Sequence, residues 1–511
     1  MTATSAPESQ PPASAAAAGH SIGEHARRGS LWMVVATGAA KGMGLLGQLA
    51  LAWLMSREEF GIYAIAISLS ALLAVMRDGG LPTVLIQKGR RFDLYAGPVF
   101  WMMLAINSLT GLVIALVARP AARFYHQPEL AAVIALFAVT VPICVPASLL
   151  GVRLTAQMRF RELGIVQVIS AVLRNVLLVL FAWHGFGAKS FMLTVLVTNV
   201  TDALLLWYLT RYSPWTRPAR VRLWPELMRS GRWVMLGTFS FGFYYNGVYF
   251  LLGKLLPSET VGTYFFAFQV ITVLATLLAN NAYQVLFAAF SRIATDTARL
   301  RAAVLRSASA MMLVASLASL GVAVVFRPLE HLLWHGKWAD AAGAVQVFAV
   351  IWPAVALNNV LQALQAARGH FRLWGSIAFI TSLPAVLGSA LGALVRGSVD
   401  AAAVGYAIGT LLGLLINVRY SLMLLDMRVG PTMASALRPW LAAIAAAVAA
   451  IAVGHLLGEG VLAMLASTLS FCVSALLFLR LVANDSLALV VESLRRMISA
   501  RAFARTPATD S

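Results

Sequence analysis

Five charged side chains lie deep inside long apolar stretches of this 511-residue sequence: Lys41, Arg77, Asp78, Arg174 and Asp202. A charge at bilayer depth costs several kcal/mol, so such groups normally face protein or water instead of lipid. Three cations against two carboxylates make a positive interior, which suits an anionic ligand such as a phosphate or pyrophosphate. We therefore interpret Lys41, Arg77 and Arg174 as candidate substrate-binding cations.

The two carboxylates have more than one interpretation. Asp78 and Asp202 are candidates for ion coupling or for structural ion pairs. Arg174 and Asp202 fall on consecutive antiparallel spans, so a structural pair between them is as good an interpretation as a ligand site. Arg77 and Asp78 come just before two glycines and Pro82, where a helix can break or bend.

Two arginines in apolar stretches of the second half, Arg419 and Arg480, lie within a turn or two of the cytoplasmic ends, so we interpret them as anchors. Deeper in the membrane, the second half carries neutral polar groups. In transmembrane helices such groups join neighbouring helices more often than they bind ligands. The candidates for lining a cavity are Tyr245, Asn246, Asn280, Asn281, Asn358 and Asn359.

The composition excludes several classes of protein. Hydrophobic residues make up 60% of the chain and charged residues 12%, against about 25% charged in soluble domains. The net charge of +19 does not indicate a nucleic-acid partner, because the cations lie in short loops between apolar runs. Both cysteines lie in apolar runs, so neither a disulfide framework nor a metal cluster is expected. Without a phosphate-binding glycine loop, an HExxH motif or a Ser/His/Asp grouping, the sequence predicts neither an enzyme nor a cofactor.

A span of about 20 apolar residues crosses a bilayer as a helix. The sequence predicts an all-α polytopic membrane protein with fourteen such spans: 31–55, 60–87, 96–118, 131–152, 163–184, 189–210, 233–255, 261–283, 304–326, 343–366, 373–395, 401–424, 437–457 and 461–482.

The distribution of Lys and Arg predicts the orientation of the spans. The two tails and the loops after even-numbered spans hold 26 of the 39 basic residues, and the other loops hold 8. Basic loops stay in the cytoplasm. We therefore expect a multi-pass membrane protein with both termini in the cytoplasm, including a disordered tail over 1–28 and a second tail over 484–511.

The two halves of the chain resemble each other. LMSREEFGIY at 54–63 aligns with LLPSETVGTY at 255–264, an offset of 201 that also pairs Trp32 with Trp233. Spans one to six thus recur as spans seven to twelve, and the copies should be related by an axis along the membrane normal. The predicted parts are an N-lobe (29–210), a basic cytoplasmic linker (211–232), a C-lobe (233–425) and the extra spans thirteen and fourteen (426–483).

Three segments carry a family resemblance: 54–87, 290–306 and 335–349. They resemble Wzx-type polysaccharide flippases of the MOP superfamily, which also contains MATE exporters and lipid II flippases. The resemblance implies a two-lobed fold that moves undecaprenyl-pyrophosphate-linked oligosaccharide across the inner membrane by alternating access, for extracellular polysaccharide, capsule or O-antigen. It implies as partners the lipid-linked oligosaccharide, the lipid bilayer, and the polymerase and export machinery of the same pathway.

Two alternatives remain open. A MATE-like small-molecule antiporter would favour carboxylates in its cavity, and this sequence offers mainly Asp78 and Asp202. A membrane polysaccharide polymerase or ligase would be expected to carry larger external loops with Arg and His than the longest one here, 327–342.

Overall fold

The computed structural model describes residues 42–44, 47–73, 81–87, 91–369, 371–425, 429–458, 460–485, 487–488 and 492. Every regular element in these residues is a helix, which confirms the all-α class. The helices up to the middle of the chain are α2 (Arg57–Leu73), α3 (Leu81–Gln87), α4 (Phe92–Phe124), α5 (Pro128–Ala156), α6 (Phe160–Trp183) and α7 (Lys189–Thr210).

The second half continues in the same way after two single turns of 3-10 helix, η3 (Pro214–Thr216) and η4 (Val221–Leu223). Its helices are α8 (Trp224–Leu255), α9 (Ser258–Arg292), α10 (Thr297–Trp334), η5 (Ala339–Ala341), α11 (Ala342–Ala367), α12 (Phe371–Arg396), α13 (Val399–Met423), α14 (Val429–Leu457) and α15 (Val461–Val482).

Ten helices within the described residues are long and apolar enough to cross a membrane: α4 to α7 and α10 to α15. The outer faces of these helices are apolar as well. On α15, Leu465, Leu469 and Val473 lie one turn apart, and each is more than half exposed. Such a stripe is compatible with lipid and not with water. The chain is therefore a multi-pass membrane protein, and the count of fourteen spans stays a prediction.

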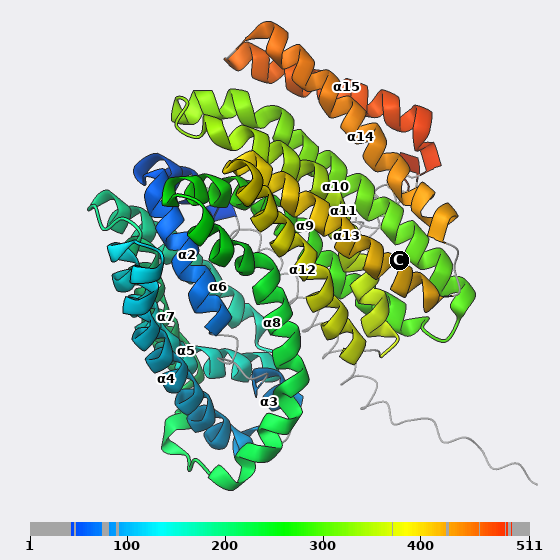
Figure 1. Ribbon diagram of the computed structural model, residues 1–511. Helices are drawn as coiled ribbons and strands as arrows, with labels where there is room; N and C mark the ends of the chain where they lie inside the picture. The colour runs from blue at the N-terminus through cyan, green and yellow to red at the C-terminus, as the bar shows by residue number, and fades with distance from the viewer. Residues whose placement is uncertain are drawn as a thin grey trace, which may run out of the picture.

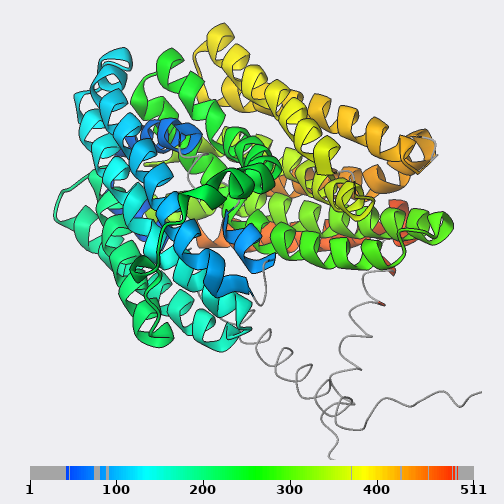
Figure 2. The same cartoon turned by 90° about the horizontal axis from the view of Figure 1, so that it is seen from below.

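The helices form two lobes (Figure 1). α2 and α4 to α7 make one group, in which α5 packs on α2, α4 and α7, and α8 to α13 make the other. α14 and α15 pack on each other and on α10, on the side of the second lobe that faces away from the first. Figure 2 shows the same separation from below.

Small residues allow the tightest helix contact in the second lobe, between α12 and α13. Gly388 and Gly392 on α12 face Gly405 and Gly409 on α13, and a Cβ at Gly405 would lie 1.9 Å from the carbonyl oxygen of Gly388. Glycines four residues apart line up on one helix face, and in lipid this spacing lets two backbones meet. The sequence of this pair therefore specifies a close pairing without any polar group.

The lobes meet where α2 crosses α9, and this contact is symmetric. A Cβ at Gly61 would lie 1.8 Å from the carbonyl oxygen of Ser258, and a Cβ at Gly262 would lie 1.8 Å from that of Arg57. Both pairs of equivalent positions, 61 with 262 and 57 with 258, differ by the repeat offset of 201. Each copy thus presents the same surface to the other, as a two-fold axis requires.

A polar cluster closes the same end of the lobe interface. We call Trp53, Arg57, Lys337, Trp338 and Asp340 the latch. Nε of Arg57 donates to the Lys337 carbonyl oxygen at 2.6 Å, and its Nη1 pairs with Asp340 at 2.6 Å. The Lys337 ammonium donates to the carbonyl oxygens of Met55 (2.7 Å) and Trp53 (3.0 Å), and burial lowers its pKa. The Trp338 indole donates to the carbonyl of Ala52 at 3.0 Å.

The other copy makes a matching contact. Lys254, the equivalent of Trp53 at the offset of 201, donates to the carbonyl oxygen of Phe124 at 2.9 Å. The Tyr125 hydroxyl donates to the carbonyl of Phe250 at 3.0 Å. Among the described residues, the hydrogen bonds between the two lobes all involve the ends of helices next to the loops at 55–57, 124–128, 255–258 and 335–341. We call this the latch end of the protein.

The basic linker packs against the opposite end of the first lobe. Asp93 at the start of α4 pairs with Arg153 at 2.9 Å and with Arg217 of the linker at 3.4 Å. Tyr212 lies under both guanidinium groups, and burial together with the nearby Asp93 carboxylate raises its pKa to about 12. These contacts attach the linker to α4 and α5.

We predict that Gly61→Ala and Gly262→Ala each destabilise the protein. A glycine-to-alanine change inside a helix normally stabilises it by about 0.5–1 kcal/mol, but here the new methyl would overlap a backbone carbonyl, and overpacking costs about 1–3 kcal/mol. Thermal unfolding of the purified protein should show a lower midpoint for both variants. Gly242→Ala, where a Cβ would meet open space, is the matched control and should not lower the midpoint. Equal midpoints for all three variants would contradict the close crossing of α2 and α9.

The latch generates a second prediction. Lys337→Gln removes an ammonium that bonds two carbonyls of the other lobe, and two hydrogen bonds at about 1 kcal/mol each correspond to roughly 30-fold in an opening equilibrium. Amide hydrogen exchange over residues 53–63 should be faster by about that factor. Lys189→Gln, at the start of α7 and outside the latch, should leave the exchange unchanged. Wild-type protection in Lys337→Gln would show that these bonds do not hold the lobes together.

Candidate functional site

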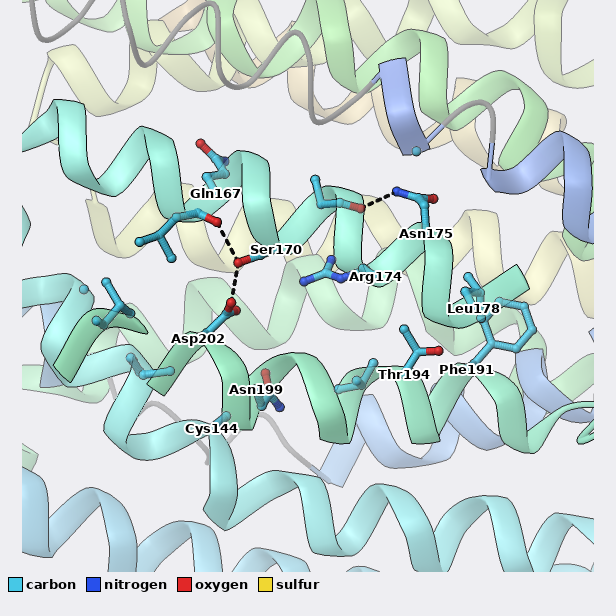
Figure 3. A pocket seen from close by; sticks show the side chains of 18 of the residues that line it. Cys144, Gln167, Ser170, Arg174, Asn175, Leu178, Phe191, Thr194, Asn199 and Asp202 are labelled. Carbon is cyan, nitrogen blue, oxygen red and sulfur yellow. Dashed lines mark hydrogen bonds between the residues drawn. The ribbon is translucent and has the colours of Figure 1, made fainter. Parts of the chain in front are cut away.

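A cavity of about 840 Å³ lies among the helices of the first lobe. Most of its wall comes from α5, α6 and α7, and Gln269 of α9 adds one residue from the second lobe (Figure 3). Its polar lining consists of Gln48, Tyr63, Cys144, Ser148, Gln167, Ser170, Arg174, Asn175, Thr194, Asn199, Asp202 and Gln269.

Helical periodicity puts the polar groups on facing stripes. Gln167, Ser170 and Arg174 are three and four residues apart, so they share one face of α6. On α7, Asn199 and Asp202 are three residues apart and share the face opposite. In Figure 3 the side chains of Arg174 and Asp202 both project into the space between the two helices. Each stripe alone would be a costly polar face in lipid, and together they line one polar chamber.

Asp202 is held by a neighbour on the other stripe. Its Oδ1 is hydrogen-bonded to the Ser170 hydroxyl, which also lies 2.7 Å from the carbonyl oxygen of Val166 (Figure 3). Ser170 is buried and Asp202 is half-buried. The carboxyl group therefore has a defined position in the wall of the cavity.

Arg174 remains available to a ligand. Its side chain is exposed to the cavity, and within the part of the chain that the structure describes it makes neither a hydrogen bond nor an ion pair. Asp202 is close enough to act on it through space but does not form a salt bridge with it. An arginine whose five N–H groups are free to bond is a strong recognition element for phosphate oxygens.

The aromatic wall toward α2 is rigid. Tyr63 stacks on Phe191 of α7 with ring centroids 3.6 Å apart and nearly parallel planes. Both residues line the cavity, so α2, which also carries the crossing with α9, forms part of its boundary. A shift of α2 would therefore change the shape of the cavity.

The neutral candidates of the second lobe lie elsewhere. Asn246 donates to the carbonyl of Gly242 at 3.1 Å, and Tyr245 packs against Tyr244. Asn358 accepts a hydrogen bond from Asn417, and Asn359 lies next to it on α11. Tyr245, Asn246, Asn358 and Asn359 do not line the cavity of the first lobe.

Asn358 belongs to a polar network inside the second lobe. Gln365 donates to Asn417 at 2.6 Å and to Ser421 at 2.9 Å, and Ser421 donates to Asn417 at 3.1 Å. These bonds join α11 to α13. The network therefore acts as a helix-to-helix contact, the role that is usual for such residues in membranes.

The remaining candidates cannot be placed. Lys41, Arg77 and Asp78 lie outside the described residues. Asn280 and Asn281 belong to α9, but their side chains also lie outside the description.

Sequence reasoning missed several residues of the cavity, namely Gln48, Gln167, Ser170, Asn175, Thr194, Asn199 and Gln269. A signal for some of them was present: Gln167 and Ser170 extend the face of Arg174 by helical spacing, and Asn199 does the same for Asp202. The contribution of Gln269 had no local signal, because it depends on how the two lobes meet.

The arrangement is suited to binding and not to catalysis. The cavity offers a guanidinium, a carboxyl group, four side-chain amides from α6, α7 and the helix at 47–54, and a further amide from α9. Within the described residues no group of His, Cys, Asp and Glu is arranged to hold a metal ion. Such a lining can bind an anion that also carries many hydroxyl groups.

Solved structures with the same fold are known. The lipid II flippase MurJ in an inward closed conformation superposes with a TM-score of 0.70, covering 88% of this chain and 99% of MurJ at 11% identity. An inward-facing multidrug resistance MATE family transporter of the MOP superfamily superposes with a TM-score of 0.54, covering 77% and 94% at 15% identity. At these identities the likeness concerns the fold.

Sequence relatives are named for polysaccharide biosynthesis. The lipopolysaccharide biosynthesis protein WzxC of Escherichia coli is 23% identical over 406 residues, 78% of this chain and 80% of WzxC. The succinoglycan biosynthesis transport protein ExoT of Rhizobium meliloti is 24% identical over 335 residues, 64% of each chain. Residues 50–343, more than half of the chain, match the sequence family described as polysaccharide biosynthesis protein. The chain therefore belongs to this family of polysaccharide biosynthesis proteins and has the two-lobed fold that MurJ and the MATE transporters share.

Proposed function

We propose that this protein is a flippase that moves a lipid-linked oligosaccharide repeat unit from the cytoplasmic to the periplasmic leaflet of the bacterial inner membrane. The observation that carries the proposal is Arg174, an arginine without an ion-pair partner among the described residues, which faces a cavity of about 840 Å³ inside the membrane domain. A guanidinium at this depth is costly unless it has a water-filled or anionic environment. The diphosphate of a polyprenyl-linked sugar would supply the anion.

The relatives support the class of substrate. WzxC, ExoT and the teichuronic acid biosynthesis protein TuaB of Bacillus subtilis are named for three different polysaccharides, and MurJ is named as a lipid II flippase. A substrate common to such proteins is a sugar on a lipid carrier. We propose undecaprenyl pyrophosphate as the carrier, with the sugars meeting the amide-rich wall of the cavity and the lipid tail remaining in the membrane.

The direction of transport follows from the charge bias of the loops. The latch end carries the loops after odd-numbered spans, which hold 8 basic residues against 26 on the other side. We assign the latch end to the periplasm and both termini to the cytoplasm. In this assignment the lobes are closed toward the periplasm, and the cavity would receive substrate from the cytoplasmic side. To expose the cavity to the other side, the lobes would have to separate at the latch end.

Three further proposals complete the assignment. Lys41 and Arg77 are proposed to add positive charge to the same chamber. The parts of the chain are proposed to be the N-lobe (29–210), linker (211–232), C-lobe (233–425) and two additional spans (426–483). The polymerase and export machinery that use the product are proposed partners.

The cavity charge argues against the competing classes. A drug-exporting antiporter needs negative groups for cationic substrates, whereas the described lining holds one arginine and one aspartate. A polymerase would need a catalytic constellation, which the lining does not offer.

We predict that Arg174→Gln lowers polysaccharide export. Loss of a hydrogen bond to a charged group costs about 1.5–3 kcal/mol, so transport at limiting substrate should fall roughly 10- to 100-fold while the protein level in the membrane stays normal. Arg174→Lys should retain part of the activity, because the charge remains and the two-pronged geometry is lost. Complementation of a deletion strain, with immunoblotting of membranes, measures both.

The matched control is Arg419→Gln, which removes an exposed arginine of α13 that does not line the cavity. It should export normally. Lys41→Ala and Arg77→Ala, tested in the same strain, should abolish export; full complementation by both would remove these two residues from the site. Full activity of Arg174→Gln would contradict the proposal that this cavity binds the diphosphate of the substrate.

Deletion of the gene should cause lipid-linked repeat units to accumulate on the cytoplasmic side of the inner membrane. The reason is that assembly continues there while transfer is blocked. Extraction of the lipid-linked sugars, with and without an enzyme that reaches only the periplasmic leaflet, locates them. Accumulation in the periplasmic leaflet would instead identify a polymerase or ligase.

A further inference from the structure

The hydroxyl group of Ser170 contacts two oxygen atoms, and its single hydrogen can be donated fully to only one of them. Its hydroxyl lies within hydrogen-bond distance of the Val166 carbonyl oxygen, at 2.7 Å, and of Oδ1 of Asp202. A serine hydroxyl carries one hydrogen and two lone pairs. It therefore cannot donate to both oxygens at full strength, and an ionised carboxylate has no hydrogen of its own to offer.

A protonated Asp202 satisfies both contacts. In that state the carboxyl group donates to the oxygen of Ser170, and Ser170 donates to the carbonyl of Val166. In the ionised state Ser170 must turn its hydrogen to Asp202, and the bond to Val166 is lost. The Val166 carbonyl is part of the α6 helix, where a serine commonly bonds the residue one turn before it. The site therefore has two arrangements that differ by one proton and one hydroxyl rotation.

Arg174 lies one turn beyond Ser170 on the same face of α6, so it senses the charge of Asp202. The other titratable groups that line the same cavity are Arg174 on α6, Cys144 on α5 and Tyr63 on α2. The thiol of Cys144 bonds the carbonyl of Val141. Within the described lining, Asp202 is the one carboxyl group and Arg174 the one cation. The negative charge of an ionised Asp202 thus weakens the attraction between Arg174 and any anionic ligand.

We propose that Asp202 is a proton switch for anion binding: the substrate diphosphate and one proton enter the cavity together. The proton passes from water in the cavity to a carboxylate oxygen of Asp202, and no covalent bond of the substrate changes. This inference rests on the proposed function, since it assumes that Arg174 binds the diphosphate. It makes Asp202 a residue that tunes affinity and acts through Arg174, without touching the substrate.

The coupling is reciprocal. If protonation of Asp202 strengthens anion binding, the bound anion must strengthen protonation by the same factor. The protein with bound substrate and proton then moves one negative charge fewer across the membrane than the substrate alone carries. On the far side, Asp202 releases its proton to water. The ionised carboxylate then attracts Arg174 again, and this attraction weakens the binding of the anion.

The test is calorimetric titration of the purified full-length protein in lipid nanodiscs with inorganic pyrophosphate. Titrations at about pH 6 and about pH 8, each in two buffers of different ionisation enthalpy, give both the affinity and the number of protons taken up. The wild type should bind roughly tenfold more tightly at the lower pH and should take up more protons than Asp202→Asn. Pyrophosphate titrates in this range too, but it does so equally for every variant, so the difference between proteins is the readout.

Asp202→Asn keeps the shape of the carboxyl group in its neutral form. It should bind tightly at both values of pH, with the pH dependence reduced to that of the ligand. Ser170→Ala should move the midpoint of the pH dependence upward, because the ionised carboxylate loses its donor. A purely structural role for Asp202 would lower binding at every pH and leave the proton uptake unchanged.

The outcomes separate the two proposals. If Asp202→Asn keeps the pH dependence and proton uptake of the wild type while Arg174→Gln loses binding, the proton switch is wrong and the proposed function stands. If Arg174→Gln binds pyrophosphate as well as the wild type does, the diphosphate site itself is wrong. Absence of wild-type binding at both values of pH would overturn both.

Discussion

The backbone contact between α2 and α9 is the constraint on which the rest of the structure depends. At Gly61 and Gly262 each helix approaches the carbonyl oxygens of the other so closely that a methyl group would not fit. In lipid, where burial of apolar surface drives little association between helices, such close packing supplies the attraction. Because the two positions are equivalent in the repeat, the contact is two-fold symmetric. It gives the lobes a common pivot, and the latch adds hydrogen bonds at the same end.

The two lobes share a plan but differ in chemistry. In the second lobe, Gln365, Asn417 and Ser421 form hydrogen bonds with one another between α11 and α13. These polar groups therefore hold two helices together. In the first lobe, the polar faces of α6 and α7 turn toward a cavity, and Arg174 stays without an ion-pair partner among the described residues. The polar groups of the second copy thus join helices, whereas those of the first copy line a cavity.

The cavity is linked to the pivot through α2. Tyr63, two residues beyond Gly61, stacks on Phe191 in the cavity wall, and Gln269, seven residues beyond Gly262, contributes from the second lobe. Motion of the lobes about the crossing must therefore move two walls of the chamber. In the proposed mechanism, this arrangement would connect binding in the cavity to movement of the lobes through packed side chains.

The sequence by itself determined the class of protein, the positions of most helices, the repeat offset of 201 and the presence of Arg174 and Asp202 at membrane depth. These follow from local physics: apolar length sets the spans, and a charge in an apolar run has few stable environments. Only the tertiary structure decided that Arg174 and Asp202 share a chamber without forming an ion pair, that Ser170 lies between two acceptors, and that Asn358 is used for packing. Those facts depend on the rotation of each helix about its axis and on the contact of residues more than 30 positions apart, which no local pattern in one sequence encodes.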